Sequence, residues 1–141
     1  MTGPTPPTPR EVAEGYLGAF AGADADDIAS RVTDDFVNEH TSAMGRGCTG
    51  RDAYRERLPG FLGGFSGLVY DIEDMVVDGD RVAAAYTMRA RWQGDAPIEV
   101  RGVQRLTIRD GRVARRVDYW DSLVFLLQVD PAVRDALSAW V

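Results

Sequence analysis

The chain has 141 residues, of which 45% are hydrophobic and 27% are charged, and these values are typical of one soluble globular domain with its own core. Its net charge of -6 argues against a nucleic-acid partner, because nucleic-acid binding favours a basic surface. Cys48 is the only cysteine and His40 the only histidine, which excludes an intrachain disulfide, a cysteine cluster and a site of several histidines.

The N-terminal segment, residues 1–9, is rich in Thr and Pro and contains no apolar core. We therefore expect a disordered leader and not a signal peptide, followed by one domain over residues 10–141. No apolar run in the sequence approaches the roughly 20 residues that a membrane-spanning helix needs. These features predict a cytoplasmic protein without a membrane partner.

Helical patterns fill the first part of this domain. Val12, Tyr16 and Phe20 recur at helical spacing, and Asp24 is a suitable N-cap for a second, short helix. The predicted order is a helix over 10–22, a short helix over 24–32, a strand over 36–41, a glycine-rich loop over 45–50 and a third helix from about 50 that is interrupted or ends near 59–64.

Strand-like runs and turns follow. Asp78-Gly79-Asp80 and Asp110-Gly111 each separate two such runs, and Asp-Gly favours the tight turn of a hairpin. Helices first and an antiparallel meander afterwards predict an α+β fold, with helices on one face of a curved sheet. The predicted strands are 68–78, 81–92, 98–109 and 112–121, followed by helical pieces over 122–129 and 131–140.

The last predicted strand carries the main catalytic candidate. Neighbouring side chains on a strand point to opposite faces, so Asp118 and Trp120 share one face. If that face is buried, desolvation raises the pKa of the carboxyl group toward the range that is useful for proton transfer. The same pattern fits an Asp at a strand end in a surface ion pair with a neighbouring Arg, and this segment does not decide between the two.

His40 is the second candidate, on the same face of its short strand as Phe36 and Asn38. An imidazole has an ordinary pKa near neutrality, so it can act as a base or an acid, or hydrogen-bond a carboxylate. A purely structural histidine is the alternative. If His40 and Asp118 face one cavity, they form an acid/base pair whose surroundings can separate their pKa values.

The second and third long strands are predicted to form a pocket wall. Tyr86 and Trp92 share one face of the second strand, and Gln104 lies on one face of the third. Tyr86 and Gln104 are able to orient a polar substrate group, although a core position is the alternative for each. The opposite faces carry an arginine set, predicted to be solvated or to face a dimer partner: Arg89, Arg91, Arg101 and Arg105.

The chain resembles the SnoaL-like, or nuclear transport factor 2-like, superfamily along nearly its whole length after residue 10. The segments that carry this resemblance are Thr33–His40, Thr49–Tyr54, Val77–Val82 and Asp110–Asp121. The resemblance implies a cone-shaped α+β barrel, in which a curved, mostly antiparallel sheet and three N-terminal helices enclose a deep apolar pocket. Relatives include polyketide cyclases, limonene epoxide hydrolases, ketosteroid isomerases and non-catalytic proteins.

The resemblance carries over one catalytic position. The cyclases and the epoxide hydrolases have a catalytic Asp near the end of the last strand, which matches Asp118. Other positions differ: His40 stands where the steroid isomerases have their base, and Gly102 where they have a neutral Asp. The Arg-x-Asp pair of the epoxide hydrolases falls on Tyr86 and Met88.

Together these observations predict a small cofactor-free enzyme for an apolar oxygenated molecule of polyketide or terpenoid type. General acid/base chemistry fits cyclisation, isomerisation, dehydration and epoxide hydrolysis, with Asp118 and His40 as catalytic residues and no metal. A homodimer through the outer sheet face is implied by the resemblance. The alternative is a non-catalytic small-molecule-binding or dimerisation module of the same fold. The substrate-binding candidates are Tyr16, Asn38, Tyr86, Trp92, Gln104 and Trp120.

Overall fold

The helical layer comes from the first half of the chain, as predicted. The computed structural model describes residues 3–94 and 96–140. The elements of this layer are α1 (Pro9–Ala19), the short 3-10 helix η1 (Phe20–Gly22), α2 (Ala25–Ser30) and α3 (Arg51–Gly63). α3 continues through Pro59 and ends at Gly63.

Several helix boundaries differ from the prediction, among them the start of α1 and the end of α2. α1 begins at Pro9, one residue early, because Thr8 and Glu11 form a capping box: the Thr8 hydroxyl accepts from the Glu11 amide and the Glu11 carboxylate accepts from the Thr8 amide. α2 ends at Ser30 instead of continuing to Val32, which is fully buried as the first residue of a strand.

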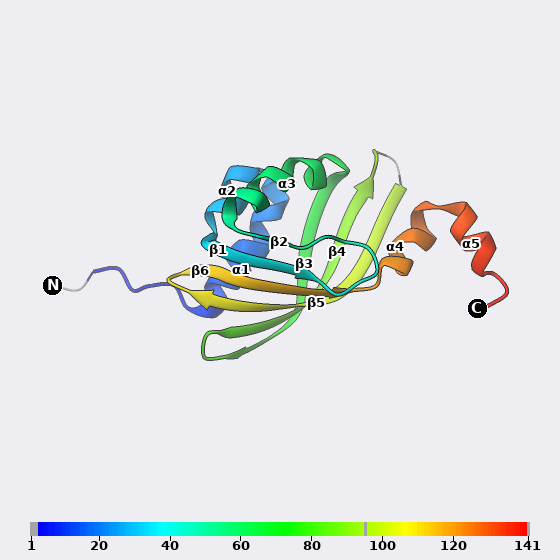
Figure 1. Cartoon of the computed structure of the whole chain (residues 1–141). Helices are drawn as coiled ribbons and strands as arrows, with labels where there is room; N and C mark the ends of the chain where they lie inside the picture. Colours follow the sequence, from blue (N-terminus) through cyan, green and yellow to red (C-terminus); the bar gives the residue numbers. More distant parts are fainter. Residues whose placement is uncertain (1–2, 95, 141) are drawn as a thin grey trace.

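Within the described residues, the sheet has six strands in the order β2-β1-β6-β5-β4-β3, and its two edges, β2 and β3, do not pair with each other. All pairings are antiparallel except that of β1 with β6, which confirms the predicted curved, mostly antiparallel sheet. Figure 1 shows α1, α2 and α3 gathered on one side of this sheet. The strands are β1 (Val32–His40), β2 (Cys48–Thr49), β3 (Phe65–Asp78), β4 (Arg81–Trp92), β5 (Ala96–Arg109) and β6 (Arg112–Trp120).

The predicted loop over 45–50 contains the short edge strand β2, which pairs with Val37 and Asn38. A glycine is required at position 47, because a Cβ atom there would lie 2.4 Å from the carbonyl oxygen of Asn38. This close approach holds the preceding part of the loop, including Met44 and Arg46, beside the cavity described below.

The register of β6 brings distant parts of the chain together. Along the parallel β1–β6 pair, Asn38 is opposite Arg116 and His40 is opposite Asp118. On the other side of β6, Gln104 of β5 is opposite Asp118. Residues almost 80 positions apart in sequence therefore project from neighbouring strands at one end of the sheet.

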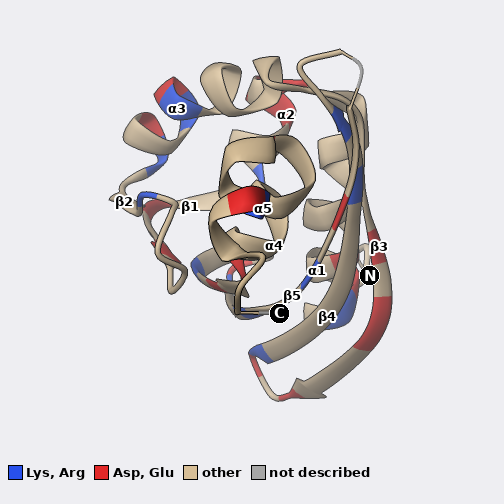
Figure 2. Cartoon of the chain, turned by 90° about the vertical axis from the view of Figure 1, so that its right-hand side faces the viewer, with Lys and Arg blue, Asp and Glu red and all other residues tan. Residues whose placement is uncertain are grey.

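The C-terminal helices α4 (Ser122–Val129) and α5 (Pro131–Leu137) lie at the end of the molecule away from the N-terminal segment (Figure 1). Figure 2 views this end, with α4 and α5 between α3 on one side and β3 and β4 on the other. Within the described residues, no helix is both long enough and apolar enough to cross a membrane.

Arginines on the outer sheet face form ion pairs with β3 and β5. Arg101 donates to the Glu73 carboxylate at 2.7 Å, and Arg89 pairs with Asp71 and lies 3.6 Å from Glu99. These arginines are partly solvated, as predicted, and acidic neighbours compensate their charges.

Candidate active site

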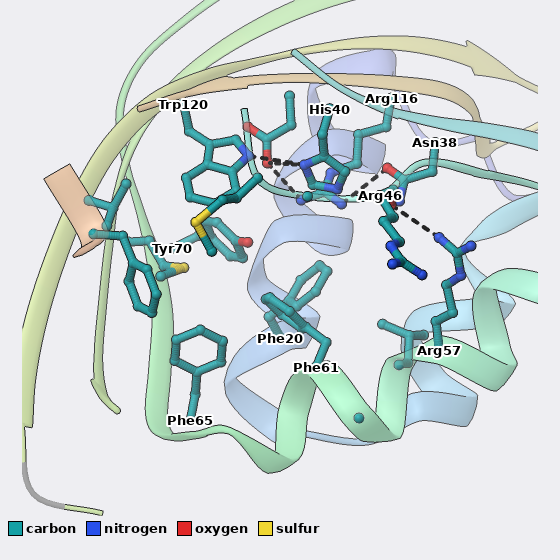
Figure 3. A pocket seen from close by; sticks show the side chains of 18 of the residues that line it. Phe20, Asn38, His40, Arg46, Arg57, Phe61, Phe65, Tyr70, Arg116 and Trp120 are labelled. Carbon is teal, nitrogen blue, oxygen red and sulfur yellow. Dashed lines mark hydrogen bonds and ion pairs between the residues drawn. The ribbon is translucent and has the colours of Figure 1, made fainter. Parts of the chain in front are cut away.

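A cavity of about 430 Å³ opens between the inner face of the sheet, α3 and α4. Its volume falls within the range of about 300–1,000 Å³ that is usual for small-molecule sites. Aromatic side chains dominate the wall, and Figure 3 shows several of them converging on the cavity. These aromatic residues are Phe20, Tyr54, Phe61, Phe65, Tyr70, Tyr86, Trp92, Trp120 and Phe125.

Asp118 is the one carboxylate among the described residues that line this cavity, and its side chain is only 5% exposed. The Tyr86 hydroxyl donates to Oδ1 at 2.7 Å, and the Arg116 guanidinium donates to Oδ2 at 3.1 Å. Burial is the largest influence and raises the pKa of Asp118, while Arg116 and the Tyr86 hydrogen bond oppose this rise. The surface ion pair that the sequence left open is wrong, since both partners are buried.

Arg116 holds this carboxylate from inside the protein. Its Nε donates to Oε1 of Gln104 at 2.9 Å, and one terminal nitrogen donates to Oδ1 of Asn38 at 3.3 Å. Its guanidinium also lies over the rings of Tyr16 and Phe20, at 6.0 and 5.9 Å from their centroids. A buried cation is stable only when such partners compensate its lost hydration, so this arrangement fixes Arg116 in one position.

His40 also lines the cavity, with its Nδ1 4.0 Å from Oδ2 of Asp118. This separation is too long for a hydrogen bond. Nδ1 instead accepts a hydrogen bond from the Trp120 indole N–H at 3.0 Å, as the dashed line in Figure 3 shows. Burial lowers the pKa of His40 from 6.5 to about 4, and the cations of Arg116 and Arg57 add to this effect. At neutral pH the imidazole is therefore uncharged and carries its proton on Nε2.

Two of the predicted substrate-binding residues do not line the cavity. Gln104 is fully buried behind the wall, where it accepts a hydrogen bond from Arg116. Tyr16 is also fully buried, beneath Arg116, and its hydroxyl is 2.5 Å from that of Tyr54. Both predictions placed these residues one layer too close to the ligand, because the Arg116 guanidinium hydrogen-bonds Gln104 and lies over the Tyr16 ring. The other four predicted residues do line the cavity: Asn38, Tyr86, Trp92 and Trp120.

Sequence reasoning missed Arg116 and the two arginines at the mouth, Arg46 and Arg57. A signal for Arg116 was present, because it lies two residues before Asp118 on a strand and so shares its face. Arg46 and Arg57 are exposed, and they come from the loop before β2 and from α3. No spacing in the sequence relates either of them to β6.

Most of the chain matches the model of a known protein family. The family model described as SnoaL-like domain matches residues 13–116, well over half of the chain. The protein belongs to the SnoaL-like domain family. No curated protein matches the sequence.

Solved structures share the fold of this SnoaL-like protein at low sequence identity. One is a hypothetical protein from Catenulispora acidiphila with a ketosteroid isomerase-like fold, in complex with trimethylamine, with 20% identity, 88% and 93% coverage of the two chains and a TM-score of 0.76. A provisionally assigned SnoaL-like polyketide cyclase from Shewanella denitrificans has 21% identity, coverage of 87% and 97% and a TM-score of 0.77. TerC, co-crystallised with polyporic acid, has 21% identity, coverage of 87% and 99% and a TM-score of 0.75.

The family match supports the SnoaL-like fold of this chain but says little about its chemistry. It ends at Arg116, two residues before Asp118, so it does not include the candidate base. The roles of Asp118 and His40 therefore depend on the geometry of this chain.

Proposed function

We propose that the protein is a small cofactor-free enzyme that performs general acid/base chemistry on an apolar, oxygenated molecule of polyketide or terpenoid type. The observation that carries this proposal is the Asp118 carboxylate, which is buried in the wall of an otherwise mainly aromatic cavity. Its raised pKa makes it a stronger base than an exposed Asp, while Arg116 keeps it ionisable.

In the proposed reaction, Asp118 removes a proton from a carbon or hydroxyl of the substrate and becomes a neutral carboxylic acid. The electron pair of the broken bond moves toward a substrate oxygen. The same carboxylic acid then returns its proton at another position, which completes an isomerisation or cyclisation without net consumption of acid. His40 assists as a neutral hydrogen-bond donor through Nε2, because Trp120 already occupies Nδ1.

Two relatives of the same fold favour this class of substrate. The Shewanella denitrificans protein is provisionally assigned as a polyketide cyclase, and TerC was co-crystallised with polyporic acid. The aromatic wall of the present cavity supports a ring-containing ligand in the same way, since flat apolar rings pack well against aromatic side chains.

Proton abstraction can be tested without knowing the natural substrate. The protein is incubated in deuterated water with a panel of apolar ketones, and mass spectrometry measures deuterium uptake next to the carbonyl group. We expect Asp118→Asn to slow this exchange by about 10²–10⁴-fold, the usual contribution of general acid/base catalysis. Asp80→Asn, in the turn between β3 and β4, is the matched control and leaves the rate unchanged. Equal rates for wild type and Asp118→Asn contradict the proposal.

A non-catalytic ligand-binding module is the competing function. It is favoured by the fact that both oxygens of Asp118 already accept hydrogen bonds from the protein, as in a structural ion pair. The two functions differ in one measurement. If the protein is a binding module, added ligand quenches the fluorescence of Trp92 and Trp120, but the protein catalyses no deuterium exchange with any ketone of the panel.

We also propose a homodimer through the outer sheet face. Val103 of β5 and Tyr119 of β6 are opposite each other in the register and are 38% and 40% exposed. Such apolar side chains on an exposed sheet face favour association. Light scattering gives the mass directly, and Val103→Asp is expected to shift a dimer to the monomer mass. A monomeric wild-type protein contradicts this proposal.

A further inference from the structure

The charge of the cavity differs in sign from that of the chain. The whole chain has a net charge of -6. Among the described residues that line the cavity, the charged groups at neutral pH are Asp118, Arg116, Arg46 and Arg57. Asp118 and Arg116 compensate each other through their buried ion pair. The cavity therefore has an excess of two positive charges in an acidic protein, and both belong to exposed side chains at its mouth.

Arg57 is held in place by the loop that borders the cavity. One of its terminal nitrogens donates to the backbone oxygen of Gly47 at 2.6 Å and to that of Arg46 at 3.1 Å. Among the described residues, no side chain accepts a hydrogen bond from Arg57, and no carboxylate forms an ion pair with it or with Arg46. Both other arginines of α3 differ in this respect, since Arg51 pairs with Asp34 and Arg55 pairs with Asp26.

The two arginines lie on one side of the cavity, and the aromatic wall lies on the other. Figure 3 shows Arg46 and Arg57 beside Asn38, with Phe65 and Tyr70 across the cavity from them. Arg57 also lines the same cavity as His40 and Asp118. A ligand that spans the cavity meets an apolar surface at one end and two cations at the other.

We propose that the ligand of this cavity is an amphipathic anion, an apolar ring body with a carboxylate or a comparable acidic group that binds between Arg46 and Arg57. The guanidinium group of Arg is well suited to this contact, because it presents parallel N–H donors to a carboxylate. The inference rests on the proposed function only in taking the cavity as the substrate site, and it narrows the substrate to an acid. It also orients the ligand, with its acidic end at the mouth and its apolar body against the aromatic wall.

Matched pairs of probes test this inference. Naphthoate and biphenylcarboxylate are each compared with their methyl esters, which have the same ring and no charge. Quenching of Trp92 and Trp120 at neutral pH gives the dissociation constants, and the NMR signal of the single histidine, His40, reports occupancy of the cavity. We expect each acid to bind about tenfold more tightly than its ester at low salt, and this preference to fall in 0.5 M salt through screening.

Three variants test whether the arginines at the mouth of the cavity cause the preference for acids over esters. Arg46→Gln and Arg57→Gln are each expected to bring the acid and its ester to within about twofold of each other. Arg55→Gln is the control. Arg55 has the same charge as Arg57 and lies on the same helix, α3, but it does not line the cavity. Arg46→Gln is informative even if Arg57→Gln disturbs the loop, since the Arg46 side chain makes none of the hydrogen bonds that hold it.

Each outcome decides the inference separately from the enzymatic proposal. Equal affinity for acid and ester, binding of neither acid, or a preference that survives both Arg46→Gln and Arg57→Gln overturns it. The deuterium-exchange experiment does not enter this comparison, and Asp118→Asn is expected to keep the preference for acids. A protein that prefers acids but catalyses no exchange retains the anion site and loses the proposed function.

Discussion

The protonation of His40 determines part of the acid stability of this protein. Burial in the cavity wall lowers its pKa to about 4 in the folded state, whereas the unfolded chain takes up this proton near the ordinary value of 6.5. Between these two pH values the unfolded state binds more protons. The stabilisation is therefore complete above pH 6.5 and is lost as the pH falls toward 4.

The size of this effect follows from the two pKa values. One pKa unit corresponds to about 1.4 kcal/mol, so the interval from 6.5 to about 4 sets an upper limit of about 3.5 kcal/mol. The imidazole keeps some contact with water, because its side chain is 16% exposed. We therefore expect about 2 kcal/mol of the free energy of unfolding to depend on this group.

Two measurements check this expectation. Because His40 is the only histidine, its NMR signals titrate without overlap and give the folded-state pKa directly. Urea unfolding at pH 7 and pH 4 is then compared between wild type and His40→Gln. Wild type is expected to lose about 2 kcal/mol more than the variant, and acidic groups common to both cancel in this difference. A titration midpoint near 6.5, or an equal loss in both proteins, refutes the reasoning.

Three further predictions concern groups in the cavity wall and behind it, all measured by urea unfolding at neutral pH. Arg116→Met leaves the buried Asp118 carboxylate without its cation and is expected to destabilise the fold by about 3–5 kcal/mol; a loss below about 1 kcal/mol contradicts a buried ion pair. Gln104→Leu removes the acceptor of the Arg116 Nε and is expected to lose about 1–3 kcal/mol, whereas an unchanged stability means that this hydrogen bond is dispensable. Gly102→Ala places a Cβ atom 2.5 Å from the Tyr86 hydroxyl and from the Tyr119 carbonyl oxygen. It should lose about 1–3 kcal/mol and weaken the Tyr86 contact with Asp118, and full stability contradicts the close approach.

Periodicity predicted most of the fold, because helices and strands bury one face each. The turn Asp110-Gly111 and the strands on either side of it lie where the alternation of apolar and polar residues placed them. Strict alternation fails within β6, however. Thr107 pairs with Arg115 and Ile108 with Val113, so Ala114 is an extra residue in a β-bulge. On the N-terminal side of the bulge, the side chains of β6 therefore point to the opposite faces from those that alternation predicts. Val113 belongs to the core, although alternation assigned it to the outer face.

The candidate site was less predictable than the fold, because it depends on contacts between strands distant in sequence. The shared face of Asp118 and Trp120 follows from their spacing on one strand, and both do line the cavity. The position of His40 beside them depends on the parallel β1–β6 register, which no local pattern specifies. Gln104 shows the reverse case: its face was assigned correctly, but Arg116 stands between it and the cavity.

The proposed acid/base function explains the buried ion pair of Arg116 with Asp118 better than a contribution to stability does. Replacing a buried ion pair by well-packed apolar residues is often neutral or stabilising, so a module that only needs an apolar cavity gains little from this pair. Its position also has a direct consequence for a bound ligand. A ligand that fills the cavity excludes solvent from the small part of Asp118 that is still exposed, and this desolvation raises the pKa of Asp118 further. Under the proposed function, the binding step that brings a substrate to Asp118 therefore makes the carboxylate a stronger base, and Arg116 keeps it charged until the proton is transferred.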